Sequence, residues 1–136
     1  MFKSIIILFL ISIITCKAQS NLHEIKKSDY TTITHTVADS VFVNSEPEDL
    51  SYSEILDIEK LLKQELGRKL KKHNYFRQYI AVKNQYNEKI VWVNFLCKKY
   101  YLPIMETQVS NLKSGDCFFE LKVNLTKQNI FDFKQN

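Results

Sequence analysis

The sequence predicts an α+β fold in which one long helix packs on an antiparallel sheet of about four strands. Between residues 52 and 72, apolar residues recur every three or four positions, which is the period of an amphipathic helix. After residue 74 the pattern changes to β-rich runs separated by polar turns, as in an antiparallel sheet. Because the apolar face of a helix must be covered, the helix and the strands are expected to share one core.

The helix is expected at residues 52–72. Ser51 and Glu54 have the spacing of a capping box, in which each side chain bonds to a backbone amide that the helix leaves without a partner. The apolar stripe behind them consists of Ile55, Ile58, Leu62, Leu66 and Leu70. Gly67 lies within this stretch at a cost of roughly 1 kcal/mol relative to alanine, so it indicates close packing or an early helix end.

Strands are expected mainly after the helix. Residues 75–83 and 88–97 flank a polar turn and predict a hairpin, and residues 117–125 alternate strictly between apolar and polar side chains. Weaker patterns predict short strands at 106–112 and 130–133, and one or two more within residues 30–44. Residues 45–49, which contain a proline and three acids, indicate a loop.

Alternation also assigns the two faces of the expected sheet. The sets expected to face the core are Val91, Val93, Phe95 and Cys97 in one strand, and Cys117, Phe119, Leu121, Val123 and Leu125 in the other. Trp92 and Phe118 belong to the opposite sets, so both are expected to be exposed. They are therefore the candidate surface for binding a partner.

The first 18 residues have the features of a secretory signal peptide. A short positive segment is followed by a charge-free apolar run, which is too short to cross a membrane of roughly 30 Å, and then by small residues. Two processing routes are open. Cleavage after Ala18 would release a soluble chain, whereas acylation of Cys16 would anchor the protein to a membrane. Either route places the protein in the periplasm, in the cell envelope or outside the cell.

The remaining 118 residues suffice for one domain with a single modest core. Residues 19–50 are expected to form a polar leader and short strands, and residues 51–136 the α+β domain itself. Removal of Lys3 and Lys17 with the signal peptide lowers the formal net charge from +4 to +2. This charge is too small to indicate a nucleic-acid partner.

Cys97 and Cys117 lie at the ends of two expected strands in a chain bound for an oxidising compartment, so a disulfide is expected between them. A closed loop of about 20 residues would stabilise the fold by roughly 3 kcal/mol. Two buried, reduced thiols are the alternative. A catalytic cysteine with His73 as its base has thin support, because both cysteines belong to core-facing sets.

Other familiar kinds of site are not indicated. His23, His35 and His73 stand far apart in the sequence, and neither a Cys-x-x-Cys nor a His-Glu-x-x-His spacing occurs, so no metal site is expected. The chain has only two glycines, which excludes the glycine-rich loops that bind nucleotides, and no cofactor is expected.

Three stretches resemble small exported hypothetical proteins of Bacteroidota-type bacteria. They are an Arg-Gln-Tyr strand at residues 77–79, a hairpin that runs from Glu88-Lys89 to Val93-Asn94 and Cys97, and Gly115-Asp116-Cys117-Phe118-Phe119. The likeness extends from about residue 50 to residue 132, although Ser-Gly-Asp precedes Cys117 where Gly-Gly-Asn is more usual. It implies export and a shared fold, and it assigns no activity to any residue.

The expected layout is broadly cystatin-like or NTF2-like, and such a fold does not decide function. The first hypothesis is a non-catalytic envelope or secreted protein that binds a protein or glycan partner through Trp92 and Phe118. The second is a small extracellular hydrolase, which would need a cleft with perturbed carboxylates such as Asp116 or Glu120. No residue is assigned a catalytic role.

Overall fold

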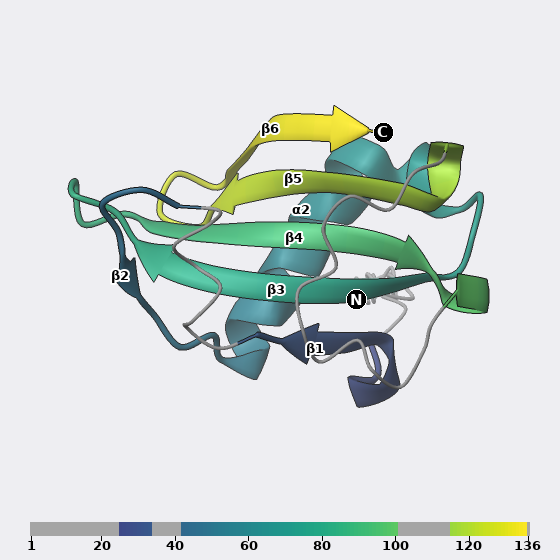
Figure 1. Cartoon of the computed structure of the whole chain (residues 1–136), viewed down its shortest axis with the longest axis horizontal. Helices are drawn as coiled ribbons and strands as arrows, with labels where there is room; N and C mark the ends of the chain where they lie inside the picture. The colour runs from purple at the N-terminus through teal and green to yellow at the C-terminus, as the bar shows by residue number, and fades with distance from the viewer. Residues whose placement is uncertain (1–24, 34–41, 101–114, 136) are drawn as a thin grey trace, which may run out of the picture.

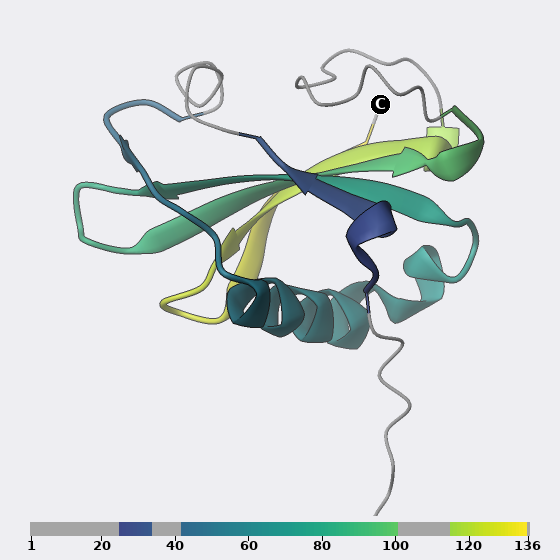
Figure 2. The same ribbon diagram turned by 90° about the horizontal axis from the view of Figure 1, so that it is seen from below.

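The computed structural model describes residues 25–33, 42–100 and 115–135 and shows one long helix lying across one face of a sheet (Figures 1 and 2). The expected signal peptide, Cys16 and the expected strand at 106–112 lie outside the described residues. The elements are, in order, η1 (Lys27–Asp29), β1 (Tyr30–Thr32), β2 (Glu46–Pro47), α2 (Tyr52–Leu70), β3 (Tyr75–Lys83), β4 (Lys89–Cys97), η3 (Lys98–Tyr100), η4 (Gly115–Cys117), β5 (Phe118–Asn124) and β6 (Asn129–Gln135).

Among the described residues, the sheet has six strands: five follow the order β1-β3-β4-β5-β6, and the sixth, β2, pairs with β3. The predicted α+β class is confirmed, but the prediction of about four antiparallel strands is wrong. Two short segments that precede the helix join the edge of β3: β1 runs parallel to it, with Tyr30 opposite Arg77, and β2 antiparallel, with Glu46 opposite Lys83. The segment expected to be a loop at residues 45–49 therefore contains β2.

The predicted hairpin is confirmed, since β3 and β4 pair residue for residue from Tyr75 opposite Cys97 to Lys83 opposite Lys89. The strand expected at 117–125 is β5, which pairs with β4 along seven residues. β6 completes the sheet beyond β5, with a bulge between Glu120 and Lys122. β4 and β5 are therefore interior strands with partners on both sides.

The helix begins at the predicted capping box. The Ser51 amide donates to the Glu54 carboxylate at 2.8 Å, and the Glu54 amide donates to the Ser51 hydroxyl at 3.3 Å. At the other end, Leu66 has φ −121° and ψ 15°, which is not helical, and the helix ends at Leu70. The chain therefore kinks one residue before Gly67.

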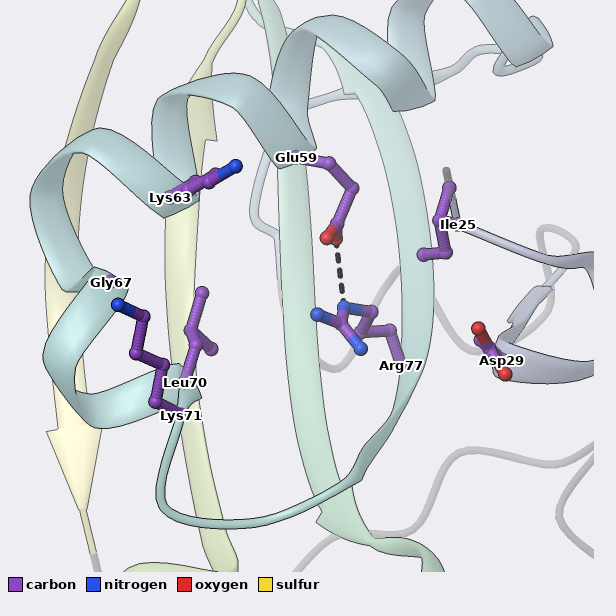
Figure 3. Close-up of a pocket in the computed structure, with 8 residues that line it drawn as sticks. All are labelled: Ile25, Asp29, Glu59, Lys63, Gly67, Leu70, Lys71 and Arg77. Carbon is purple, nitrogen blue, oxygen red and sulfur yellow. Dashed lines mark hydrogen bonds and ion pairs between the residues drawn. The ribbon is translucent and has the colours of Figure 1, made fainter. Parts of the chain in front are cut away.

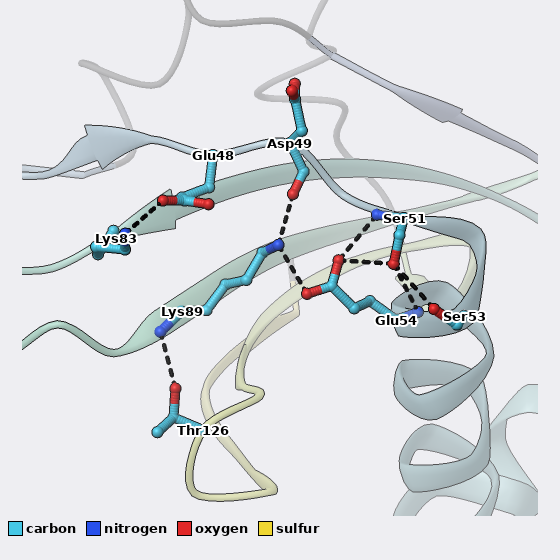
Figure 4. A network of polar contacts seen from close by, with 8 residues as sticks. All are labelled: Glu48, Asp49, Ser51, Ser53, Glu54, Lys83, Lys89 and Thr126. Atoms are coloured by element: carbon cyan, nitrogen blue, oxygen red, sulfur yellow. Dashed lines mark hydrogen bonds and ion pairs between the residues drawn. The ribbon is translucent and has the colours of Figure 1, made fainter.

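A set of polar contacts centred on Lys89 fixes the start of the helix over the sheet (Figure 4). The Lys89 ammonium donates to the Glu54 carboxylate at 2.7 Å and to the Asp49 carbonyl, while its amide donates to the Thr126 hydroxyl at 3.0 Å. Partial burial tends to raise the pKa of Glu54, but the bonds from Lys89 and Ser51 outweigh it and lower that pKa. One lysine thus joins the helix, β4 and the β5–β6 turn.

The helix covers a core formed by the predicted inward sets of β4 and β5. Ile55, Ile58 and Leu62 are at most 2% exposed and belong to one apolar cluster with the sheet residues Val91, Val93, Phe95, Phe119, Leu121 and Val123. The rings of Phe95 and Phe119 stack 4.2 Å apart, and Tyr75 meets both rings edge-on. This core accounts for the apolar stripe of the helix.

The prediction that Trp92 and Phe118 are exposed is wrong, because they are only 1% and 8% exposed. Trp92 belongs to a second apolar cluster, on the opposite face of the sheet, with Ile33, Ile80, Val82, Ile90 and the partly buried Phe42. The Phe118 ring lies 5.4 Å from that of Tyr100. Since both faces of the central strands are buried, these two residues do not form an exposed binding surface.

The predicted disulfide between Cys97 and Cys117 is present, with the two Cα atoms 4.9 Å apart. It lies next to the last β4–β5 pair, Leu96 with Phe118, and so closes the end of the sheet. Disulfides persist in oxidising compartments, which agrees with the expectation of export. Within the described ranges, no helix is both long and apolar enough to span a membrane.

Replacing both bonded cysteines with serine, as Cys97→Ser with Cys117→Ser, should lower the free energy of unfolding by about 3 kcal/mol, because the unfolded chain regains the freedom of a loop of about 20 residues. Urea unfolding of the double variant and of the oxidised wild type measures this difference. Equal midpoints would contradict a stabilising role for the disulfide.

Trp92 is the single tryptophan of the chain, so its fluorescence reports the second apolar cluster alone. We expect blue-shifted emission and weak quenching by iodide, both changing to the behaviour of free tryptophan in concentrated guanidinium chloride. Strong quenching in the absence of denaturant would show that this face of β4 is open to solvent.

Candidate functional site

A cavity of about 440 Å³ lies between α2, from Glu59 onward, and β3 (Figure 3). The helix contributes most of the lining, Arg77 comes from β3, and the segment that precedes β1 closes the remaining side. The lining residues are Ile25, Asp29, Glu59, Lys63, Gly67, Leu70, Lys71 and Arg77. Volumes of this size are typical of sites for small molecules.

The polar wall of the cavity is an ion pair between Glu59 and Arg77, drawn in Figure 3. The Arg77 Nε donates to Glu59 Oε1 at 2.8 Å, and the two side chains are only 14% and 15% exposed. The Tyr79 hydroxyl donates to the same carboxylate oxygen at 2.7 Å. Burial, and next the charge of Glu59, raise the pKa of Tyr79 well above its usual value, so this hydroxyl stays protonated.

The Arg77 guanidinium is held in one orientation. Besides its bond to Glu59, its Nη1 donates to the Tyr75 carbonyl at 2.8 Å, and its carbon lies 5.5 Å from the centre of the Phe95 ring. A guanidinium carries five N–H donors, of which these contacts use two. The group therefore stands at the wall of the cavity with its position fixed and with further donors.

Positive charge exceeds negative charge along the lining. Three of the eight lining residues are basic (Lys63, Lys71 and Arg77), and the other two charged ones, Asp29 and Glu59, are acidic. Both acids have cationic partners, since Lys98 pairs with Asp29 just as Arg77 pairs with Glu59. The pKa of Asp29 is lower than usual. Burial alone would raise it, but hydrogen bonds from the Lys98 ammonium and the Lys26 amide outweigh that effect. With both acids paired, the exposed Lys71 adds a positive charge to the lining.

Gly67 lines the cavity without a side chain of its own. A Cβ atom built at this position meets no atom within 4 Å, and the position requires no positive φ. The glycine therefore does not mark close packing. The helix continues past it to Leu70, two residues short of the expected end, and its geometry is broken at the neighbouring Leu66. Gly67 leaves an open space in the wall of the cavity.

Asp116 and Glu120, the two carboxylates suggested for a hydrolase, do not have the surroundings that a catalytic acid or base needs. Asp116 receives bonds from Lys72, Gln135 and Lys69, in that order of effect, and they lower its pKa to about 2. A carboxylate held ionised in this way is a poor general acid or base near neutral pH. Glu120 lies 3.8 Å from the Lys134 ammonium. Neither of these carboxylates lines the cavity described above.

Two features of this end of the molecule do not follow from the sequence pattern. The cavity depends on how far the helix stands from β3, and no residue pattern encodes this. The second feature is a cluster of three possible metal ligands, because one ring nitrogen of His73 lies within 4.8 Å of the sulfurs of Cys97 and Cys117. The sequence suggested His73 only as a possible base for a cysteine. The sequence offered one signal for this cluster. His73 lies just before β3, and Cys97 lies opposite Tyr75, the first residue of that strand.

Comparison with protein-family models, curated protein sequences and solved structures finds no match to this chain.

The ion pairs of Asp116 predict a specific pH dependence. Because the folded-state pKa of about 2 lies below the ordinary value of 3.8, ionised Asp116 stabilises the fold above about pH 4, and this contribution is lost as the pH falls toward 2. Asp116→Asn should therefore lower the melting temperature at pH 7, and the difference from wild type should shrink between pH 4 and pH 2. A difference that does not change with pH would contradict this assignment.

Proposed function

We propose that the protein is an exported, non-catalytic binding protein whose ligand occupies the cavity between α2 and β3. The ligand would be a small, mostly apolar molecule with one anionic group. The observation that carries the proposal is a cavity of about 440 Å³ with a fixed guanidinium, that of Arg77, in its wall. Small-molecule sites commonly combine this size with a few convergent polar groups.

The composition of the wall supports an apolar ligand body. Ile25 and Leu70 provide aliphatic surface, and the alkyl chains of the lining lysines can add to it, since lysine stems pack along apolar surface while their ammonium groups remain hydrated. An apolar group that enters such a space gains roughly 25 cal/mol for each Å² removed from water. The body of the ligand would therefore supply most of its affinity.

The excess of positive charge supports an anionic head group. Arg77 has donors beyond those used by Glu59 and Tyr75, and Lys71 is an exposed residue of the same lining. Hydrogen bonds to a charged group contribute about 1.5–3 kcal/mol, compared with about 1 kcal/mol for neutral pairs. A carboxylate ligand should thus be preferred over the matching alcohol.

The lining residues support binding rather than catalysis. The eight lining residues include no hydroxyl, thiol or imidazole group, and the Glu59 carboxylate already accepts bonds from Arg77 and Tyr79. No contact of Asp116 or Glu120 favours the alternative of a small extracellular hydrolase. The disulfide supports export, while the signal peptide and the anchoring of Cys16 remain predictions, as does the cystatin-like or NTF2-like layout.

Decanoate tests the proposal, with decanol as the matched neutral probe, both titrated calorimetrically below the concentrations at which they aggregate. We expect saturable binding of one decanoate per chain, and binding of decanol at least about tenfold weaker, which corresponds to 1.4 kcal/mol. Absence of decanoate binding, or equal affinities for the two probes, would contradict the proposed ligand class.

Gly67→Phe and Gly67→Ala form a matched pair of variants for locating the site. The phenylalanine ring would enter the space that the glycine leaves open and should abolish decanoate binding. The alanine methyl group should leave binding nearly unchanged and raise the free energy of unfolding by about 0.5–1 kcal/mol, because alanine is the better helix residue. If both variants bind decanoate like the wild type, the ligand site lies elsewhere.

A further inference from the structure

The side chains of His73, Cys97 and Cys117 form a cluster of metal-binding atoms at the end of the sheet. One ligand atom from each lies within 4.8 Å of the other two. The histidine comes from the connection between α2 and β3, one cysteine from the end of β4, and the other from η4. Two thiolates and one imidazole are a ligand set that binds Zn²⁺ in proteins, with water in the fourth position.

We propose that the reduced form of the protein binds one Zn²⁺ ion through His73, Cys97 and Cys117, and that the disulfide abolishes this site. The oxidised pair has no thiolate to offer, so the redox state of one cysteine pair decides between a covalent bond and a metal site. The inference does not depend on the proposed ligand cavity, which none of the three residues lines.

The positions of the two cysteines favour this arrangement. Their Cα atoms are 4.9 Å apart, directly beyond the β4–β5 pair of Leu96 and Phe118, so the sheet keeps them close after the disulfide is broken. Bond lengths of about 2.3 Å to sulfur and 2.0–2.1 Å to nitrogen imply ligand atoms roughly 3.5–3.8 Å apart in a tetrahedral site. To bind the ion, the two sulfurs must separate from their bonded distance and the imidazole must stand within this range of both, which requires rotation of the three side chains.

The surroundings of the cluster suit an ion with one open position. Cys97 and Cys117 are buried and belong to the apolar cluster that the helix covers, whereas His73 is exposed, so the cluster can be reached from solvent at His73. The ring of Tyr75 meets the His73 ring edge-on at 5.8 Å, and its hydroxyl donates to the Asp116 carbonyl at 2.7 Å. Tyr75 thus packs against the imidazole while its own hydroxyl is held by a hydrogen bond.

An external dithiol can reduce the disulfide and so open the metal site. Its two S–H groups are oxidised to a disulfide, the S–S bond between Cys97 and Cys117 breaks, and two electrons and two protons pass to the cysteines. Binding of Zn²⁺ then displaces both protons to solvent, because the ligands are thiolates. Since oxidation and metal binding require the same two sulfur atoms, Zn²⁺ should also slow re-formation of the disulfide.

The test uses the chain without a histidine tag and with Cys16→Ser, so that the two sheet cysteines are its only thiols. Zn²⁺ is titrated against a chromophoric chelator, and Co²⁺ is used to detect thiolate-to-metal charge-transfer absorption. We expect one metal ion per reduced chain, no binding to the oxidised chain, and a charge-transfer band in the reduced form only. Binding to the oxidised chain, or none to the reduced chain, would overturn the proposal.

His73→Ala and its neighbour Asn74→Ala separate ligation from a general effect on the loop. Loss of the imidazole should weaken Zn²⁺ binding by more than the ~10–100-fold that changes around a metal ligand produce, whereas Asn74→Ala should match the wild type. If reduction unfolds the chain, circular dichroism should show refolding on addition of Zn²⁺, and His73→Ala should abolish it. Equal affinities in all three proteins would exclude His73 as a ligand.

Discussion

The packing of the α2 apolar stripe on the central strands is the interaction on which the rest of the structure depends. Its first half is tight, since Ile55, Ile58 and Leu62 are nearly inaccessible, whereas Leu66 and Leu70 are only partly buried. The loss of helical geometry at Leu66 falls at the boundary between the two halves. A helix that is fully packed at one end and loosely packed at the other leaves space beside β3, and that space is the candidate site.

Both ends of the helix are fixed by contacts outside the core. Lys89 holds the first turn against β4, and at the far end Lys69 bonds to Asp116 and Gln135, which brings the helix against β6 and the segment that precedes β5. The disulfide closes the sheet at that same end. The cavity therefore lies between fixed points, and its shape is set in advance of any ligand, which reduces the entropic cost of binding.

Local patterns predicted the features that local interactions determine. The capping box located the start of α2, β-rich runs around a polar turn located β3 and β4, and alternation located β5 and assigned the inward sets of β4 and β5. Alternation by itself predicts one solvent-exposed face and therefore does not predict the burial of Trp92. The uncharged stretch at residues 90–97 is instead typical of a strand buried on both faces. β1 and β2 are too short to carry a pattern, and their pairing with β3 depends on the tertiary structure.

The contribution of the Glu59–Arg77 pair to the free energy of folding does not by itself explain why the pair is there. The desolvation of two buried charges can cost more free energy than their attraction provides. Apolar residues of similar volume therefore often stabilise a fold equally well or better. What an apolar pair cannot provide is a guanidinium in a fixed orientation. Tyr79 and the Tyr75 carbonyl complete the bonds that hold Arg77 in place. The stable fold thus maintains a directed positive charge beside an apolar space, an arrangement suited to recognising an amphipathic anion.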